Sequence, residues 1–417
     1  MTAPSLRVSF KPMWEIRTIT DEEVDLYRAR IDLGFGQDPS GDEDARRRFT
    51  DVFENDRMFA AFDAGDIIGT GGALSFGLTV PGGATVPMGG TTVVTVQPTH
   101  RRRGVLRALM QAHLDEVADR GEPIAGLWAS ESSIYSRFGF GPATYRQRVT
   151  MGTEGMAMRS TEPTGQVRLL DVEEAKPLVR EVYEQIRPSV AGMLTRSDGW
   201  WHARHLHERE GGGSSKRRFA VCFDGEYVGG YVAYRQKGKW EDFIAQGEIE
   251  VSELMAITPE AHRALWSFLI NIDLFTELEW WNVAVDDPLP EIVTDPRRVV
   301  RTLVDGMWLR LLDIPAAVRA RVYESDGAIV LRVEDSTRPA NSGTYRIEVV
   351  DGAADCSPTS DEPDVTCDVD VLGHLYLGGG NALAMAAAGR LLGSPTAVTS
   401  LHRLFRTDRA PWCPEVF

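Results

Sequence analysis

The residue types best suited to binding a phosphate lie between positions 93 and 117. A run of apolar, β-branched residues (93–96) ends at Pro98, and proline cannot continue a sheet ladder. Three arginines and a glycine (101–104) follow, and from Val105 apolar residues recur at helical spacing. A strand that enters a helix through such a turn aims free backbone N–H groups and the positive end of the helix dipole at one point, where the arginines add charge. The segment therefore predicts a pyrophosphate-binding cradle.

A second group of reactive side chains follows a predicted buried strand at 123–129. Ser130 comes directly after it, and Tyr135 lies on a predicted short helix that ends in Arg-Phe-Gly-Phe (137–140). A phenol with an ordinary pKa near 10 is able to donate a proton to a leaving group. The alternative is an α/β core with a basic turn, no nucleotide, and a core tyrosine whose hydroxyl is satisfied internally.

Length and charge limit the class of protein. A chain of 417 residues with 43% hydrophobic and 25% charged residues predicts a soluble globular protein of two to four domains. The net charge of −16 argues against a nucleic-acid partner and favours a cationic substrate. No signal peptide is apparent and no window approaches 18 consecutive apolar residues, so we expect a cytoplasmic protein that binds no membrane.

The four cysteines are widely spaced and show no metal-binding pattern. They are Cys222, Cys356, Cys367 and Cys413. We expect reduced thiols and no metal site. Pairing of Cys356 with Cys367 across a hairpin is the alternative.

The chain is predicted to contain three blocks, 1–152, 153–296 and 297–417. In the second block a strand at 249–257, then Pro259 and a helix, repeat the order of the cradle without its glycine. We interpret this block as a degenerate duplicate that kept the fold and lost the cofactor site; an unrelated α/β domain is the alternative.

The third block is predicted to be a separate, mixed domain. Strands are expected at 328–333, 343–350 and 365–372, with an acidic loop at 351–363 and helices at 382–392 and 396–405. The tail, 406–417, is too apolar to be a free, solvated end, so we expect it to pack against another part of the protein.

The cradle and the tyrosine segment resemble the GNAT acetyltransferases. Arg101-x-x-Gly104-x-Leu106 is similar to the Q/R-x-x-G-x-G/A loop, with Leu106 in place of its last small residue. Residues 95–104, 129–131 and 134–139, together with the three blocks, resemble the Eis (enhanced intracellular survival) family. The resemblance implies a mixed α+β fold of two tandem GNAT-like domains followed by a sterol-carrier-protein-like domain. It also implies an acetyl-CoA-dependent N-acetyltransferase of aminoglycosides or lysine side chains, and a homo-oligomer, since family members form hexamers.

The same resemblance assigns roles to individual residues. Tyr135 would be the general acid and the terminal carboxylate of Phe417 the general base. Asp38 and Glu415 are candidates for binding the cationic substrate. The candidates for binding acetyl-CoA are Val94, Val96, Arg101, Arg102, Arg103, Gly104, Leu106 and Ser130.

The chemistry of acetyl transfer adds physical requirements. A backbone N–H near Val94 can polarise the thioester carbonyl and stabilise its developing negative charge. A terminal carboxylate has an ordinary pKa of about 3.5 and needs burial, or an intervening water, to act as a base. Phe417 is alternatively a packing anchor whose carboxylate meets an arginine.

Two other functions remain open at this point. One is a protein lysine acyltransferase. The other is a non-catalytic protein that binds CoA or a hydrophobic ligand in its third domain. The arginine loop and Tyr135 favour catalysis, because a lipid carrier needs neither.

Overall fold

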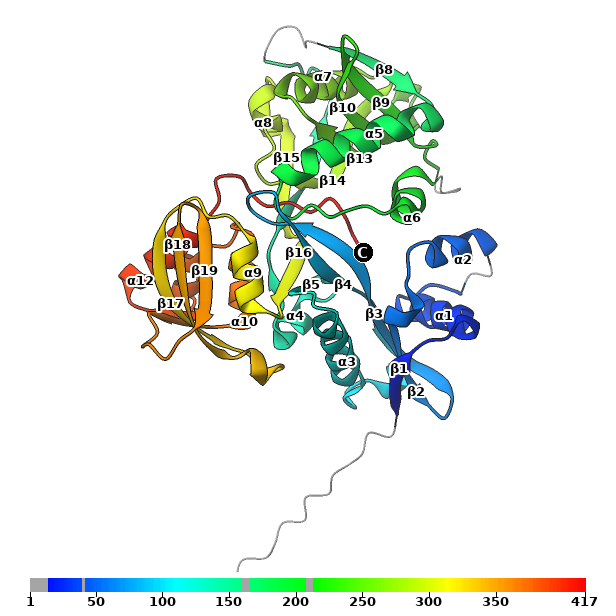
Figure 1. Ribbon diagram of the computed structural model, residues 1–417. Helices are drawn as coiled ribbons and strands as arrows, with labels where there is room; N and C mark the ends of the chain where they lie inside the picture. Colours follow the sequence, from blue (N-terminus) through cyan, green and yellow to red (C-terminus); the bar gives the residue numbers. More distant parts are fainter. Residues whose placement is uncertain (1–13, 40–41, 160–164, 208–212) are drawn as a thin grey trace, which may run out of the picture.

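The computed structural model describes residues 14–39, 42–159, 165–207 and 213–417. Three domains surround the C-terminus, which lies near the centre of the molecule (Figure 1). The mixed α+β fold predicted from the sequence is confirmed. No helix in the described ranges is long and apolar enough to cross a bilayer.

The first domain is a seven-stranded sheet in the order β1-β2-β3-β4-β5-β16-β6. Its strands are β1 (Glu15–Thr18), β2 (Met58–Asp63), β3 (Asp66–Thr79), β4 (Thr85–Val96), β5 (Ile124–Trp128), β6 (Gly141–Pro142) and β16 (Met307–Leu311). Its helices are α1 (Val24–Gly34), α2 (Glu43–Thr50), α3 (Val105–Asp119) and α4 (Ser132–Tyr135). Strands β4 and β5 run parallel, and α3 is the crossover between them. The helix buries Leu109, Met110 and Leu114 because these residues recur on one helical face.

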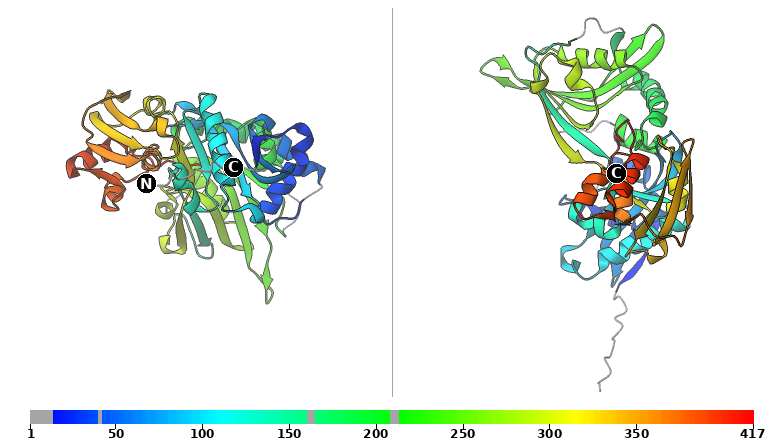
Figure 2. Two further views of the ribbon diagram at one scale, coloured as in Figure 1. Left: turned by 90° about the horizontal axis from the view of Figure 1, so that it is seen from below. Right: turned by 90° about the vertical axis from the view of Figure 1, so that its left-hand side faces the viewer.

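The second domain repeats this plan in the order β15-β7-β14-β13-β10-β9-β8. Its strands are β7 (Tyr145–Gly152), β8 (Gln166–Leu170), β9 (Arg218–Asp224), β10 (Tyr227–Lys237), β13 (Gly247–Ala256), β14 (Phe275–Ala284) and β15 (Val299–Asp305). Its helices are α5 (Val172–Ile186), α6 (Asp198–Trp200), α7 (Pro259–Ile270) and α8 (Leu289–Ile292). Strands β13 and β14 form its parallel pair, joined by α7. A small hairpin of β11 (Trp240–Glu241) and β12 (Ile244–Ala245) projects from this domain (Figure 2).

The two sheets exchange strands. β7 leaves the first domain and pairs with β14 and β15 of the second sheet. β16 follows the second domain and returns to pair with β5 and β6 of the first sheet. The first sheet thus receives β16 from beyond the predicted boundary at 296/297. The second sheet receives two strands from outside its predicted block, β7 from before 152/153 and β15 from after 296/297. The first and second domains are interlocked as a result.

The third domain is a five-stranded sheet in the order β19-β18-β17-β20-β21. Its strands are β17 (Gly327–Glu334), β18 (Gly343–Val350), β19 (Ala353–Pro358), β20 (Val365–Asp368) and β21 (Leu391–Gly393). Its helices are α9 (Ile314–Ala320), α10 (Val369–Leu375), α11 (Ala382–Ala387) and α12 (Pro395–Phe405). Leu309 of β16 and Leu372 of α10 belong to one hydrophobic cluster, so the first and third domains share a core.

Three predictions for the third domain are wrong. The expected loop at 351–363 contains β19, the strand expected at 365–372 ends at Asp368, where α10 begins, and the helix expected at 382–392 ends at Ala387, before β21. Cys356 and Cys367, whose pairing was the alternative, are free thiols. They lie on β19 and β20, and two strands separate these in the sheet. The helix expected at 396–405 is confirmed as α12.

Candidate active site

The site is built around a divergence of two parallel strands. β4 and β5 pair from Met88 opposite Ile124 to Thr91 opposite Leu127, and their pairing ends there. β4 continues to Val96, so the backbone of its last residues is unpaired on the β5 side. Backbone N–H and C=O groups require partners, and an extended ligand placed in this gap would supply them. Val94 and Val96 both lie on this unpaired stretch.

A β-bulge shapes the same stretch of β4. Thr92 pairs with Gly72 and Thr95 with Thr70, so Val93 and Val94 oppose the single residue Gly71. Val93 has a φ of 48°, which is strained for a β-branched residue. Strain of this kind is retained where a ligand site requires it, and here it redirects the backbone at Val94.

Two residues that the sequence did not single out hold the bulge. The Thr70 hydroxyl donates to the Val93 carbonyl at 2.6 Å and lies 2.7 Å from the Thr95 hydroxyl. Tyr27 of α1 is fully buried, accepts from Gly71 N–H at 3.2 Å and donates to Gly71 O at 3.1 Å. No sequence signal marks them, because a bulge depends on pairing between distant segments.

The predicted cradle forms at the start of α3. Gly104 is the N-cap residue with a φ of 93°, and Arg102 has a φ of 62°. Arg101, Arg102, Arg103 and Gly104 are all exposed. No ion pair joins the three arginines to any residue that the structure describes, so their charges are free to meet an anion. Leu106, in the first turn, packs with Val94 against the cluster that contains Tyr135.

Tyr135 is buried at the end of α4. Its side chain is 5% exposed, and its ring contacts Phe140 edge-on at 6.4 Å between centroids. Burial raises the pKa of the Tyr135 phenol, and the neighbouring Ser130 side chain opposes part of that rise. The structure therefore brings Tyr135, Ser130 and Val94 together next to the strand divergence.

The C-terminus reaches the first domain. The Phe417 ring lies 5.0 Å from the Phe76 ring, centroid to centroid. A methyl group on Gly90 would come within 3.1 Å of the Phe417 ring. Gly90 directly precedes Thr91, where the strands part, so the last residue of the chain lies beside the gap.

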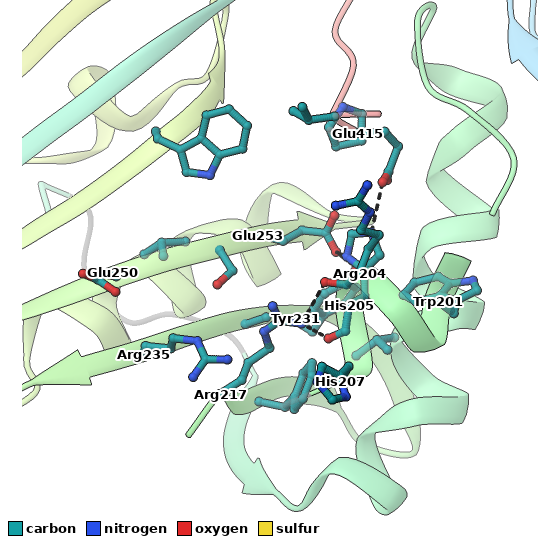
Figure 3. Close-up of a pocket in the computed structure, with 18 of the residues that line it drawn as sticks. Trp201, Arg204, His205, His207, Arg217, Tyr231, Arg235, Glu250, Glu253 and Glu415 are labelled. Carbon is teal, nitrogen blue, oxygen red and sulfur yellow. Dashed lines mark hydrogen bonds and ion pairs between the residues drawn. The ribbon is translucent and has the colours of Figure 1, made fainter. Parts of the chain in front are cut away.

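A cavity of about 700 Å³ adjoins the tail (Figure 3). Glu250, Glu253, Glu279 and Glu415 line it, and so do Arg204, Arg217 and Arg235. Glu415 is 2% exposed and is held by internal partners, whereas Asp38 is exposed in the segment after α1. The two candidate substrate residues therefore lie in different surroundings. In the described part of the chain, no three His, Cys, Asp or Glu side chains converge as metal ligands would.

Comparison with known proteins agrees with this geometry. A GNAT acetyltransferase domain matches residues 15–143, a second GNAT domain matches 192–322, and a sterol carrier protein domain matches 314–414. An uncharacterised N-acetyltransferase of Streptomyces avermitilis is 36% identical over 414 residues, which cover 97% of this chain and 99% of the relative. N-acetyltransferase Eis of Mycobacterium tuberculosis is 36% identical over 335 residues, 78% of this chain and 79% of the relative. The chain belongs to the Eis family of N-acetyltransferases.

The fold supports the family assignment. The crystal structure of Eis1 from Mycobacterium abscessus matches 97% of this chain and all of its own, with a TM-score of 0.85 and 33% identity. The chain is therefore a GNAT acyltransferase whose co-substrate is acetyl-CoA. The second GNAT match, over 192–322, also confirms that a second GNAT-like domain follows the first.

Gly104 provides a test of the cradle. An alanine at this position has room, since nothing lies within 4 Å of a Cβ there, but it disfavours the left-handed backbone conformation. Restoring that conformation to bind acetyl-CoA costs about 1–2 kcal/mol, so we expect Gly104→Ala to raise the KM for acetyl-CoA about 5- to 30-fold. Steady-state kinetics measures this.

Gly121→Ala is the matched control. Gly121 follows the other end of α3, has a φ of 76° and is equally open. The same backbone strain there should leave the KM for acetyl-CoA unchanged. Equal effects of both substitutions would show that the turn at Gly104 does not bind the co-substrate.

Proposed function

We propose that this enzyme transfers the acetyl group of acetyl-CoA directly to amines of polycationic small molecules, aminoglycosides foremost. The observation that carries the proposal is the cavity of about 700 Å³ beside the tail, whose wall contains four glutamates and three arginines. Because Arg196 binds Glu253 and Glu415, the proposed contact with a cationic amine falls to the other two glutamates. This volume lies in the range of pockets that enclose drug-sized ligands. The net charge of −16 adds a long-range attraction for cations.

The cysteines support direct transfer in a ternary complex. A covalent acyl-enzyme formed on cysteine would need a reactive thiolate. All four cysteines are buried, and burial raises the pKa of each thiol, including Cys413 on the tail. Thiols of this kind stay protonated at neutral pH and are poor nucleophiles.

The residues at the gap suit the individual steps of the reaction. The exposed arginines and the α3 N-terminus would hold the pyrophosphate, and the unpaired edge of β4 would hold the pantetheine arm. The Val94 N–H would stabilise the negative charge that develops on the thioester oxygen. The terminal carboxylate of Phe417, directly or through a water, would take a proton from the attacking amine.

Tyr135 would protonate the departing thiolate of CoA. A general acid must hold its proton until the leaving group departs. Because burial raises the Tyr135 pKa above its ordinary value of 10, the phenol stays protonated at neutral and mildly alkaline pH. Loss of activity from ionisation of Tyr135 is therefore expected only at strongly alkaline pH.

Substitution of Tyr135 by Phe tests this role. The change removes the hydroxyl and keeps the ring that contacts Phe140. We expect kcat to fall about 10²- to 10⁴-fold, the usual contribution of a general acid, with little change in the KM for acetyl-CoA. Tyr227→Phe, at a side chain that is 82% exposed, is the control and should behave as wild type. An unchanged kcat for Tyr135→Phe would mean that the hydroxyl does not take part.

The substrate class is tested by acetyl-CoA-dependent thiol release with aminoglycosides, polyamines and lysine peptides, and by product masses. We expect turnover with aminoglycosides, including products that carry more than one acetyl group. Turnover with lysine peptides alone would instead indicate a protein acyltransferase. Acetyl-CoA binding without turnover of any amine would contradict the proposed substrate class.

A further inference from the structure

The tail is anchored through Glu415, two residues before the C-terminus. Its carboxylate accepts from Arg196 Nε at 2.5 Å and from Trp200 Nε1 at 2.6 Å, and it lies 3.0 Å from His205 Nε2. All three partners belong to the second domain, and Figure 3 shows the Glu415 carboxylate directed at His205. The side chain of Glu415 is 2% exposed. A buried carboxylate with this many donors is a fixed point of the structure.

Arg196 contacts two aromatic rings and two carboxylates. Its guanidinium carbon lies 3.5 Å from the Tyr183 ring centroid and 4.4 Å from that of Trp201. Glu253 of β13 accepts from Arg196 Nη2 at 2.5 Å and from the Tyr231 hydroxyl. The guanidinium therefore joins a carboxylate of the second sheet to a carboxylate of the tail.

The charges in this cluster depend on one another. Burial alone would raise the pKa of Glu415, but the positive charges of Arg196 and His205, with hydrogen bonds from His205 and Trp200, hold it well below its ordinary value. The same cause keeps the pKa of Glu253 low despite its burial. Removing the guanidinium would leave two buried carboxylates side by side, which is costly.

The preceding part of the tail also binds to the second domain. The Trp412 backbone N–H donates to Ala191 O at 2.8 Å, and its indole N–H donates to Asn282 at 3.2 Å. Asn282 in turn donates to the carbonyls of Cys413 and Pro414, each at 3.2 Å. These contacts fix the chain that leads to Glu415.

The tail occupies the place in the second domain that corresponds to the acetyl-CoA gap in the first. β13 and β14 pair only as far as Val251 opposite Trp280 and then part. Trp412 lies at this divergence, where it lines a small cavity with Leu254 and Met255 of β13 and with Trp280 of β14. The duplicate groove is therefore filled by the chain's own tail.

The anchor limits where the terminal carboxylate can go. Two extended residues span at most about 7 Å, so Phe417 is confined close to Glu415. Beyond the anchor, the Phe417 ring contacts Phe76 and lies against Gly90, next to the point where β4 leaves β5. The second domain thus determines the position of a group that acts in the first.

We propose that the second domain is a clamp for the tail, and that Arg196, with Glu253 behind it, is a positioning residue that holds the Phe417 carboxylate in the active site. The proposal rests on the proposed function, in which that carboxylate is the base. Arg196 touches neither reacting group, and its effect passes through Glu415. In this proposal, the second domain retains its fold because that fold supplies the residues that bind the tail.

Arg196→Lys and Glu415→Gln test the clamp. Lysine keeps one charge but cannot bridge two carboxylates as a planar guanidinium does. Glutamine keeps the size of Glu415 and removes its charge. Hydrogen exchange of residues 410–417, followed by mass spectrometry, reports whether the tail is released, and kinetics report kcat and both KM values. For each variant we expect the tail to exchange about tenfold faster or more, because it is released from its anchor. We expect kcat to fall by a similar factor, with the KM values for acetyl-CoA and for the amine unchanged.

The control is Arg263→Lys on α7, at a partly exposed pair with Glu260 in the same domain. It should change neither exchange nor kinetics. If the tail of both variants, Arg196→Lys and Glu415→Gln, exchanged hydrogen as slowly as in the wild type, the clamp would be overturned. A rise confined to the KM for the amine would also overturn it, since Glu415 would then bind substrate directly. A released tail with unchanged kcat would support the clamp and refute the catalytic role of Phe417. If Arg196→Lys does not fold, the exchange and kinetics of Glu415→Gln alone test the proposal.

Discussion

The divergence of β4 from β5 after Thr91 is the constraint on which the site depends. Two parallel strands that part leave one edge of the backbone without partners, and a fold keeps such an edge only where something else binds it. The strained Val93, the Thr70 hydroxyl and Tyr27 all maintain the bulge at this point. Helix α3, with Gly104 as its N-cap, then adds an end that is suited to phosphate binding beside the same gap.

The proposed mechanism needs all three domains, because in it the two halves of the chemistry come from opposite ends of the chain. The gap and Tyr135 belong to the first domain, whereas the terminal carboxylate arrives after the third. The exchange of β7 and β16 locks the first and second domains together, and the shared core at Leu309 and Leu372 fixes the third. With the domains held in this way, a short tail is able to cross the second domain and end beside the first.

The sequence predicted those features whose signals are local. The cradle was predictable because proline, arginines and glycine occur together just before a helical pattern, and α12 because its apolar spacing is regular. The start of α10 was mistaken for part of a strand because Val365, Cys367, Val369 and Val371 alternate with polar residues. The strand exchange and the Arg196–Glu415 contact join residues far apart in the chain, 219 positions in the latter case, and no local pattern records such pairing. Glu415 was singled out as a substrate ligand, and its burial against Arg196 shows an anchoring contact that the sequence did not indicate.

Deletion of Phe417 tests the central claim most directly, that the end of the chain completes a site built by the first domain. The measurement is kcat for amine acetylation together with the Kd for acetyl-CoA of the shortened protein. The account predicts a fall in kcat of about 10²-fold or more, as for loss of a general base, with acetyl-CoA still bound as tightly as in the full chain. Wild-type turnover after the deletion would contradict the account, because the tail would then be a structural element alone.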